Sequence, residues 1–87
     1  VVRESVGMIH LLYFARLRET LGSAGEQYET AAKTVAELIA ELQGRGEPWN
    51  SALAAKVLVA VNQEMALPDT PIVAGDEVGL FPPVTGG

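Results

Sequence analysis

Cysteine is absent from the 87-residue sequence. Disulfide bonds, thiolate metal sites and thiol catalysis are therefore excluded, and a reducing cytoplasm is the compartment we expect. Histidine is nearly absent as well, because His10 is the only one. A metal site built from several histidines is excluded in the same way, and we expect His10 to lie at a partly exposed surface position.

Long apolar runs and clusters of basic residues are also missing. No stretch of about 18 apolar residues is present, so no membrane span is expected. The start lacks a basic segment followed by an apolar one, which argues against a signal peptide. Six Lys and Arg residues stand against eleven Asp and Glu residues, giving a net charge of −5. We therefore expect no nucleic-acid partner; such an acidic surface suits a basic protein partner instead.

What is present is sufficient for one small globular domain with a single core, since hydrophobic residues make up 48% of the chain. Apolar patterns and turn residues predict the elements in order. They are a strand at Met8–Phe14, a short helix at Ala15–Leu21, a strand at Glu26–Ala31, the main helix from Val35, a helical turn at Pro48–Ala54, and strands at Val57–Val61, Met65–Leu67 and Val78–Phe81.

The clearest local signal is the start of the main helix. Residues Thr34 to Glu37 have the form of a capping box. Apolar residues then recur at the spacing of one helical face, at Val35, Leu38, Ile39 and Leu42. Such a stripe is typical of core packing, so we expect this helix to cover the sheet.

The order of the elements predicts an α+β domain over residues 8–81, with one helix packed across a mixed sheet. The two strands that are apolar on both faces, Met8–Phe14 and Val57–Val61, should lie in the sheet interior. Residues Val1–Gly7 precede this pattern and are interpreted as leader residues or as an ordinary extension. The adjacent carboxylates Asp76 and Glu77 lie in a turn and point opposite ways, so we interpret them as structural.

The last seven residues, Phe81-Pro82-Pro83-Val84-Thr85-Gly86-Gly87, differ in character from the domain. Pro82 and Pro83 lack amide donors and end the strand at Phe81, so residues 82–87 should leave the sheet. At about 3.3 Å per residue this tail could reach roughly 20 Å. Gly86 and Gly87 carry no Cβ, so a narrow channel could close around them. Two interpretations stay open: a frayed terminus, or a carrier tail that reacts through the α-carboxylate of Gly87.

Four segments resemble the small subunit of molybdopterin synthase, a family of ubiquitin-like β-grasp sulfur carriers. They are MIHLLYFARLRETLG at residues 8–22, VNQE at 61–64, AGDEV at 74–78 and FPPVTGG at 81–87. The resemblance covers Met8–Gly87. Thiamin-pathway carriers share the terminal Gly-Gly but usually lack the double proline. The resemblance therefore implies a β-grasp fold and a non-catalytic carrier subunit of a sulfurtransferase.

The resemblance also implies a chemistry and a set of partners. An ATP-dependent adenylating enzyme converts the Gly87 carboxylate to an acyl-adenylate, and sulfur from a donor system displaces AMP to give a thiocarboxylate. AMP and sulfur are then transient groups on Gly87, and no cofactor is bound stably. In the large catalytic subunit the sulfur attacks cyclic pyranopterin monophosphate, and two such transfers build the dithiolene of molybdopterin. The implied complex is a heterotetramer.

Site residues follow from the same resemblance. Gly86 and Gly87 correspond to the carrier tail, with residues 82–85 as its stem. Phe81 corresponds to an apolar partner contact at the root of the tail, and Arg18 and Met65 to further partner-surface residues. The alternatives are a carrier for thiamin, cysteine or tRNA thiolation, a ubiquitin-like modifier joined to lysines through Gly87, and an interaction module with an inert tail.

Overall fold

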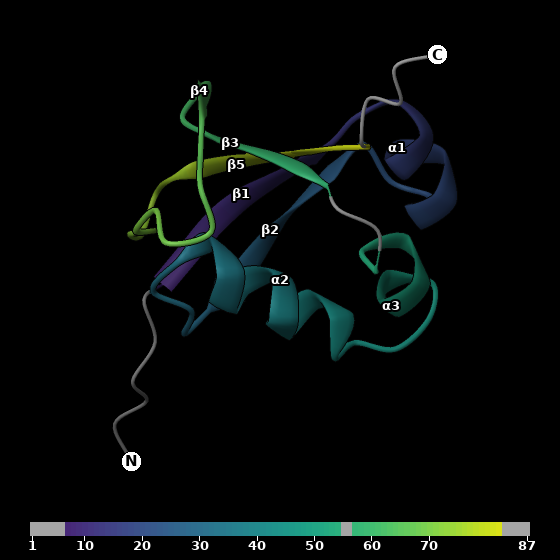
Figure 1. Ribbon diagram of the computed structural model, residues 1–87, viewed down its shortest axis with the longest axis horizontal. Helices are drawn as coiled ribbons and strands as arrows, with labels where there is room; N and C mark the ends of the chain where they lie inside the picture. Colours follow the sequence, from purple (N-terminus) through teal and green to yellow (C-terminus); the bar gives the residue numbers. More distant parts are fainter. Residues whose placement is uncertain (1–6, 55–56, 83–87) are drawn as a thin grey trace.

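The computed structural model describes residues 7–54 and 57–82 (Figure 1). Its elements are β1 (Gly7–Tyr13), α1 (Ala15–Leu21), β2 (Gly25–Thr30), α2 (Val35–Gln43), α3 (Trp49–Ala52), β3 (Leu58–Val61), β4 (Glu64–Met65) and β5 (Glu77–Phe81). The strands form one five-stranded sheet in the order β2-β1-β5-β3-β4. Because β1 and β5 are parallel and the other pairs antiparallel, the predicted mixed sheet is confirmed.

Helix α2 packs across one side of this sheet, with α3 on the same side (Figure 1). It begins where the capping box predicted, because the side chain of Thr34 accepts a hydrogen bond from the Glu37 amide at 3.3 Å. Val35, Leu38 and Leu42 are buried against the sheet, and Ile39 is half-buried. The apolar stripe is therefore core. None of the helices in the described part of the chain is long and apolar enough to cross a membrane.

An aromatic and charged cluster closes the core between β1, β2 and α3. Buried Tyr13 donates a hydrogen bond to a carboxylate oxygen of Glu26 at 2.7 Å, and Arg45 contacts the same oxygen at 3.1 Å. The Arg45 guanidinium lies 4.2 Å above the Trp49 ring, which meets Tyr13 edge-on at a centroid distance of 5.4 Å. Burial, reinforced by Glu26, raises the pKa of Tyr13, so its hydroxyl remains a neutral donor.

The first strand begins one residue earlier than the sequence suggested. Gly7 belongs to β1 and is paired with Thr30, so the domain starts at Gly7 rather than Met8. Its φ of 125° is one that side-chain-bearing residues rarely adopt, and a Cβ there would lie 2.8 Å from the Cβ of Ala74. Residues 1–6, the remainder of the expected extension, lie outside the described residues.

The other boundaries differ from expectation by one or two residues. β2 ends at Thr30 rather than Ala31, and β3 starts at Leu58 rather than Val57. β4 starts at Glu64, because Asn62 and Gln63 alone form the turn before it, both with positive φ, and it ends at Met65 rather than Leu67. The strands β1 and β3 are internal, as predicted, and flank β5 in the centre.

Candidate partner-binding face and tail root

The register of the sheet divides its side chains between two faces. Ile9, Leu11 and Tyr13 of β1 are buried toward the helices, so the alternate positions of β1 point the other way. Paired residues on neighbouring strands point to the same side. We call the opposite side the helix-free face; it comprises Met8, His10, Leu12, Phe14, Gln27, Glu29, Leu58, Ala60, Met65, Glu77, Gly79 and Phe81.

The helix-free face has a polar half and an apolar half. Around His10 the paired residues are Gln27 and Glu77, which are polar, and His10 itself is exposed as expected. The apolar half surrounds the end of β5 and contains Leu12, Phe14, Leu58, Met65 and Phe81. An apolar area bordered by polar residues is the arrangement of a protein–protein interface.

Two stacked phenyl rings lie at the centre of the apolar half. The rings of Phe14 and Phe81 are 4.5 Å apart between centroids and inclined by 4°. They lie over Gly79, where a Cβ would be 3.1 Å from the ring of Phe14 and 3.4 Å from that of Phe81. The absence of a side chain at position 79 therefore lets both rings lie close to the sheet. Phe14 is held there by its amide, which donates to the Leu80 carbonyl at 3.1 Å.

The predicted partner residues differ in how close they lie to these rings. Phe81 is half-buried and belongs to the apolar half. Met65 lies on the same face, on the edge strand β4, and is 67% exposed. Arg18 is exposed on α1, which lies at the end of the sheet where β5 finishes (Figure 1). Within the described residues, the Arg18 side chain makes no hydrogen bond or ion pair.

The tail begins directly at this apolar half. β5 ends at Phe81, and the half-buried Pro82 follows without an intervening turn. The remaining predicted tail residues, Pro83, Val84, Thr85, Gly86 and Gly87, lie outside the described residues. What the structure establishes is thus the root of the tail, at the end of the central strand of the sheet.

Sequence reasoning missed three members of the apolar half: Leu12, Phe14 and Leu58. A usable signal was present, because the first strand is apolar on both parities. Helices cover only one side of this sheet, so apolar residues of the second parity indicate a face that another protein can cover. Phe14 was interpreted as the end of a strand, and its contact with Phe81 requires the parallel pairing of β1 with β5.

The sheet order, the helix across one side and a tail leaving the central strand together define a ubiquitin-like β-grasp domain. A model of the ThiS family matches residues 11–87. The chain therefore belongs to the ThiS family.

Relatives extend this result over nearly the whole chain. The molybdopterin synthase sulfur carrier subunits of Escherichia coli and Haemophilus influenzae are 41% and 38% identical to it, each over 92% of this chain and 100% of the relative. A putative molybdopterin converting factor subunit 1 from Pyrococcus furiosus superimposes with a TM-score of 0.75 at 32% identity, covering 90% of this chain and 99% of the other.

Two further solved structures bear on partners. A complex of subunits 1 and 2 of the molybdopterin-converting factor from Helicobacter pylori contains a chain that matches with a TM-score of 0.62 and 30% identity, over 92% of this chain and 99% of the other. The small archaeal modifier protein 1 of H. volcanii matches with a TM-score of 0.66 and 28% identity, over 90% and 99%.

Proposed function

We propose that this chain is the sulfur carrier subunit of a molybdopterin synthase, and that it carries sulfur on the α-carboxylate of Gly87. The observation that carries the proposal is the position of the apolar half of the helix-free face. It adjoins the root of the tail, around Phe14 and Phe81. A partner that covers this half is thereby placed to receive the tail. The similarity to the ThiS family, which extends to Gly87, supports the same assignment.

The proposed chemistry takes place at one carbonyl carbon. The Gly87 carboxylate attacks the α-phosphate of ATP in an adenylating enzyme, which forms the acyl-adenylate and releases pyrophosphate. A sulfur nucleophile from a donor system then attacks the carbonyl carbon, and AMP leaves with its bonding electron pair. The thiocarboxylate sulfur then attacks cyclic pyranopterin monophosphate, and water cleaves the bond between the sulfur and the acyl carbon, which leaves the sulfur on the pterin and regenerates the Gly87 carboxylate. Activation is necessary because a free carboxylate is a poor electrophile.

Partner selection in this proposal uses two parts of the chain. The apolar half of the helix-free face binds the large catalytic subunit, and the tail enters that subunit's active site. Apolar rings at the centre of an interface commonly supply much of its binding energy. The acidic net charge of −5 steers encounter with a basic partner surface. A cytoplasmic heterotetramer with two carrier subunits completes the proposal.

Mass spectrometry of the protein purified from its native host tests the covalent state directly. Replacing one carboxylate oxygen with sulfur raises the mass by nearly the same amount as oxidation of a methionine, and Met8 and Met65 are both exposed. The measurement must therefore be made on a C-terminal fragment, because residues 66–87 contain no methionine. A fragment with an unmodified carboxylate throughout active molybdopterin synthesis would refute the carrier proposal.

A second candidate is a ubiquitin-like modifier joined to lysines through Gly87. It is favoured by the structural match to a protein that is itself named a modifier. The two candidates share the adenylate but differ in the nucleophile that follows it, which is sulfur in one case and a lysine amine in the other. Isopeptide-linked Gly86-Gly87 remnants on lysines of other proteins would support the modifier.

A further inference from the structure

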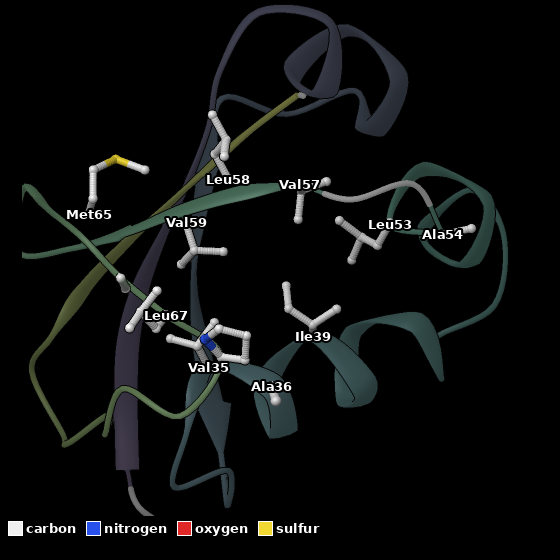
Figure 2. A pocket seen from close by; sticks show the side chains of 12 residues that line it. Val35, Ala36, Ile39, Leu53, Ala54, Val57, Leu58, Val59, Met65 and Leu67 are labelled. Atoms are coloured by element: carbon white, nitrogen blue, oxygen red, sulfur yellow. The ribbon is translucent and has the colours of Figure 1, made fainter. Parts of the chain in front are cut away.

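A second apolar surface lies on the helix side of the sheet, between α2 and the β3–β4 hairpin (Figure 2). We call it the α2–β3 groove. Its volume is about 690 Å³, and all twelve residues that line it are apolar. Figure 2 shows Ile39 of α2 and Val59 of β3 directed toward each other across this space. Val59 points to the helix side of the sheet, and Leu58 and Met65 of the helix-free face line the rim of the groove, so the two surfaces meet at β3 and β4.

The chemistry of the lining residues limits which class of molecule can bind in the groove. No lining side chain carries a hydrogen-bonding group, so a small polar ligand would lose its hydration without compensation. Leu67 is 67% exposed, and the Ala36 amide donates to the Pro68 carbonyl at 2.8 Å, so Val35 and Ala36 lie beside Leu67 and Pro68 at one end of the groove. A row of apolar side chains from another protein would cover these surfaces and gain hydrophobic free energy.

A helix suits the groove better than an added strand. The sheet edge beside it is β4, which is two residues long. Pro68 follows shortly after and has no amide hydrogen to offer. Strand addition needs a longer row of free backbone groups, whereas a helix presents apolar residues at i, i+3, i+4 and i+7 to a groove.

Charge around the groove indicates the flanking residues of that helix. Three exposed carboxylates are adjacent in sequence to lining residues: Glu37 follows Ala36, Glu64 precedes Met65 and Asp69 follows Pro68. None of the described residues adjacent in sequence to a lining residue is basic; Lys56, which precedes Val57, lies outside the described residues. An occupant with Lys or Arg beside its apolar stripe is complementary to this border.

We propose that the α2–β3 groove binds an amphipathic helix of a partner protein whose apolar face is bordered by Lys and Arg. The groove shares Leu58 and Met65 with the apolar half of the helix-free face, whereas Phe14 and Phe81 at the root of the tail do not line it. This inference goes beyond the proposed carrier function and does not depend on it.

Titration of the full chain, labelled with ¹⁵N and ¹³C, with designed peptides tests the groove by NMR. The first probe is a helical peptide of about 14 residues with Leu at i, i+3, i+4 and i+7 and Lys elsewhere. The second has Glu in place of every Lys. We expect the Lys peptide to shift signals of Val35, Ile39, Val59 and Leu67, and to bind at least about tenfold more tightly than the Glu peptide. Shifts confined to the helix-free face, or equal affinities of the two peptides, would overturn the proposal.

Matched variants on α2 distinguish peptide binding in the groove from nonspecific hydrophobic binding elsewhere on the protein. Ala36 and Ala40 are both exposed, but of the two only Ala36 lines the groove. Ala36→Phe should fill the groove and abolish binding of the Lys peptide, and Ala40→Phe should leave it unchanged. Glu64→Lys combined with Asp69→Lys should weaken the same peptide, whereas Glu29→Lys on β2 should have a much smaller effect. If Ala36→Phe melts like the parent chain yet binds the peptide equally well, the groove is not the binding site.

Discussion

Asn62 and Asp76 tie the β3–β4 turn to the turn that precedes β5. The Asn62 amide nitrogen donates to an Asp76 carboxylate oxygen at 3.0 Å, and its amide oxygen accepts from the Glu77 backbone at 3.0 Å. The second Asp76 oxygen accepts from the Val73 amide at 2.9 Å. Asp76 is therefore structural, as its place in a turn predicted, and the VNQE and GDEV segments form one contact.

Replacing Asn62 tests this contact. Asn62→Ala should lower the free energy of unfolding by about 2–3 kcal/mol, because it removes two hydrogen bonds and places alanine at a φ of 51°. Asn62→Gly tolerates that φ and should cost less, which separates the hydrogen bonds from the backbone conformation. Urea denaturation measures both. Equal losses for the two variants would mean that backbone conformation contributes nothing.

Leu38 tests the core under α2. Leu38 is fully buried, so Leu38→Ala should destabilise the domain by about 2–5 kcal/mol through a cavity that the neighbours do not fill. The control is Ala40→Ser on the exposed side of the same helix, expected to change stability by about 0.5 kcal/mol or less. Thermal or urea unfolding provides the comparison. A loss at Leu38 no larger than at Ala40 would contradict the burial.

Phe81 tests the partner face. Phe81→Asp should weaken binding of the large subunit by at least about tenfold, because a carboxylate would replace a ring at the centre of the apolar half. Phe14→Asp should act similarly, since the two rings stack. Gln27→Asp, on the polar half of the same face, is the matched control. Isothermal titration calorimetry measures affinity and circular dichroism checks folding. Folded variants with unchanged affinity would place the interface elsewhere.

Deleting Gly87 tests the carrier chemistry. The shortened chain still ends in a carboxylate, but its acyl carbon is withdrawn by about 3.3 Å, comparable to the contact distance of about 3–3.5 Å between reacting atoms. We expect sulfur transfer to be lost and the melting temperature to be retained. The assay reconstitutes the adenylating enzyme, a sulfur source, the large subunit and the pterin precursor. Normal product formation by the shortened chain would refute the proposed role of Gly87.

The raised pKa of Tyr13 predicts that the stability of the domain falls at alkaline pH. This pKa is raised above the ordinary value of 10.0 by burial and by Glu26, and that of Tyr28 is raised by burial and by Glu41. Below about pH 10 both tyrosines are neutral in the folded and unfolded chains, so this stability is fully present. Above about pH 10 the unfolded chain releases protons that the folded chain retains, so stability should fall.

Melting curves between about pH 8 and pH 11.5 measure this loss. Tyr13→Phe removes one of the two groups and should make the decline above pH 10 shallower. Leu11→Val, at a buried position of the same strand, controls for general destabilisation without removing a titrating group. Parallel pH profiles of the parent chain and Tyr13→Phe would contradict a raised pKa at Tyr13.

The sequence predicted the parts of the fold that rest on local patterns. The α2 helix is predicted at its residues because the capping box and the 3.6-residue stripe both lie within the helix and its N-cap. The start of β1 was missed because Gly7 is fixed by Thr30 and Ala74, which are distant in sequence. The tail over residues 82–87 is predicted from its composition and stays a prediction beyond Pro82, whereas the Phe14–Phe81 stack depends on strand pairing that no local pattern encodes.

The cluster of Tyr13, Arg45 and Trp49 gives the protein an optical reporter. Trp49 is the only tryptophan, and it is held between a guanidinium and a phenol on the helix side. Its emission should report separation of α3 from β1 during unfolding. A partner that covers the opposite face contacts none of these groups. Trp49 fluorescence can therefore report whether the domain is folded, while calorimetry reports partner binding, and the two measurements remain independent.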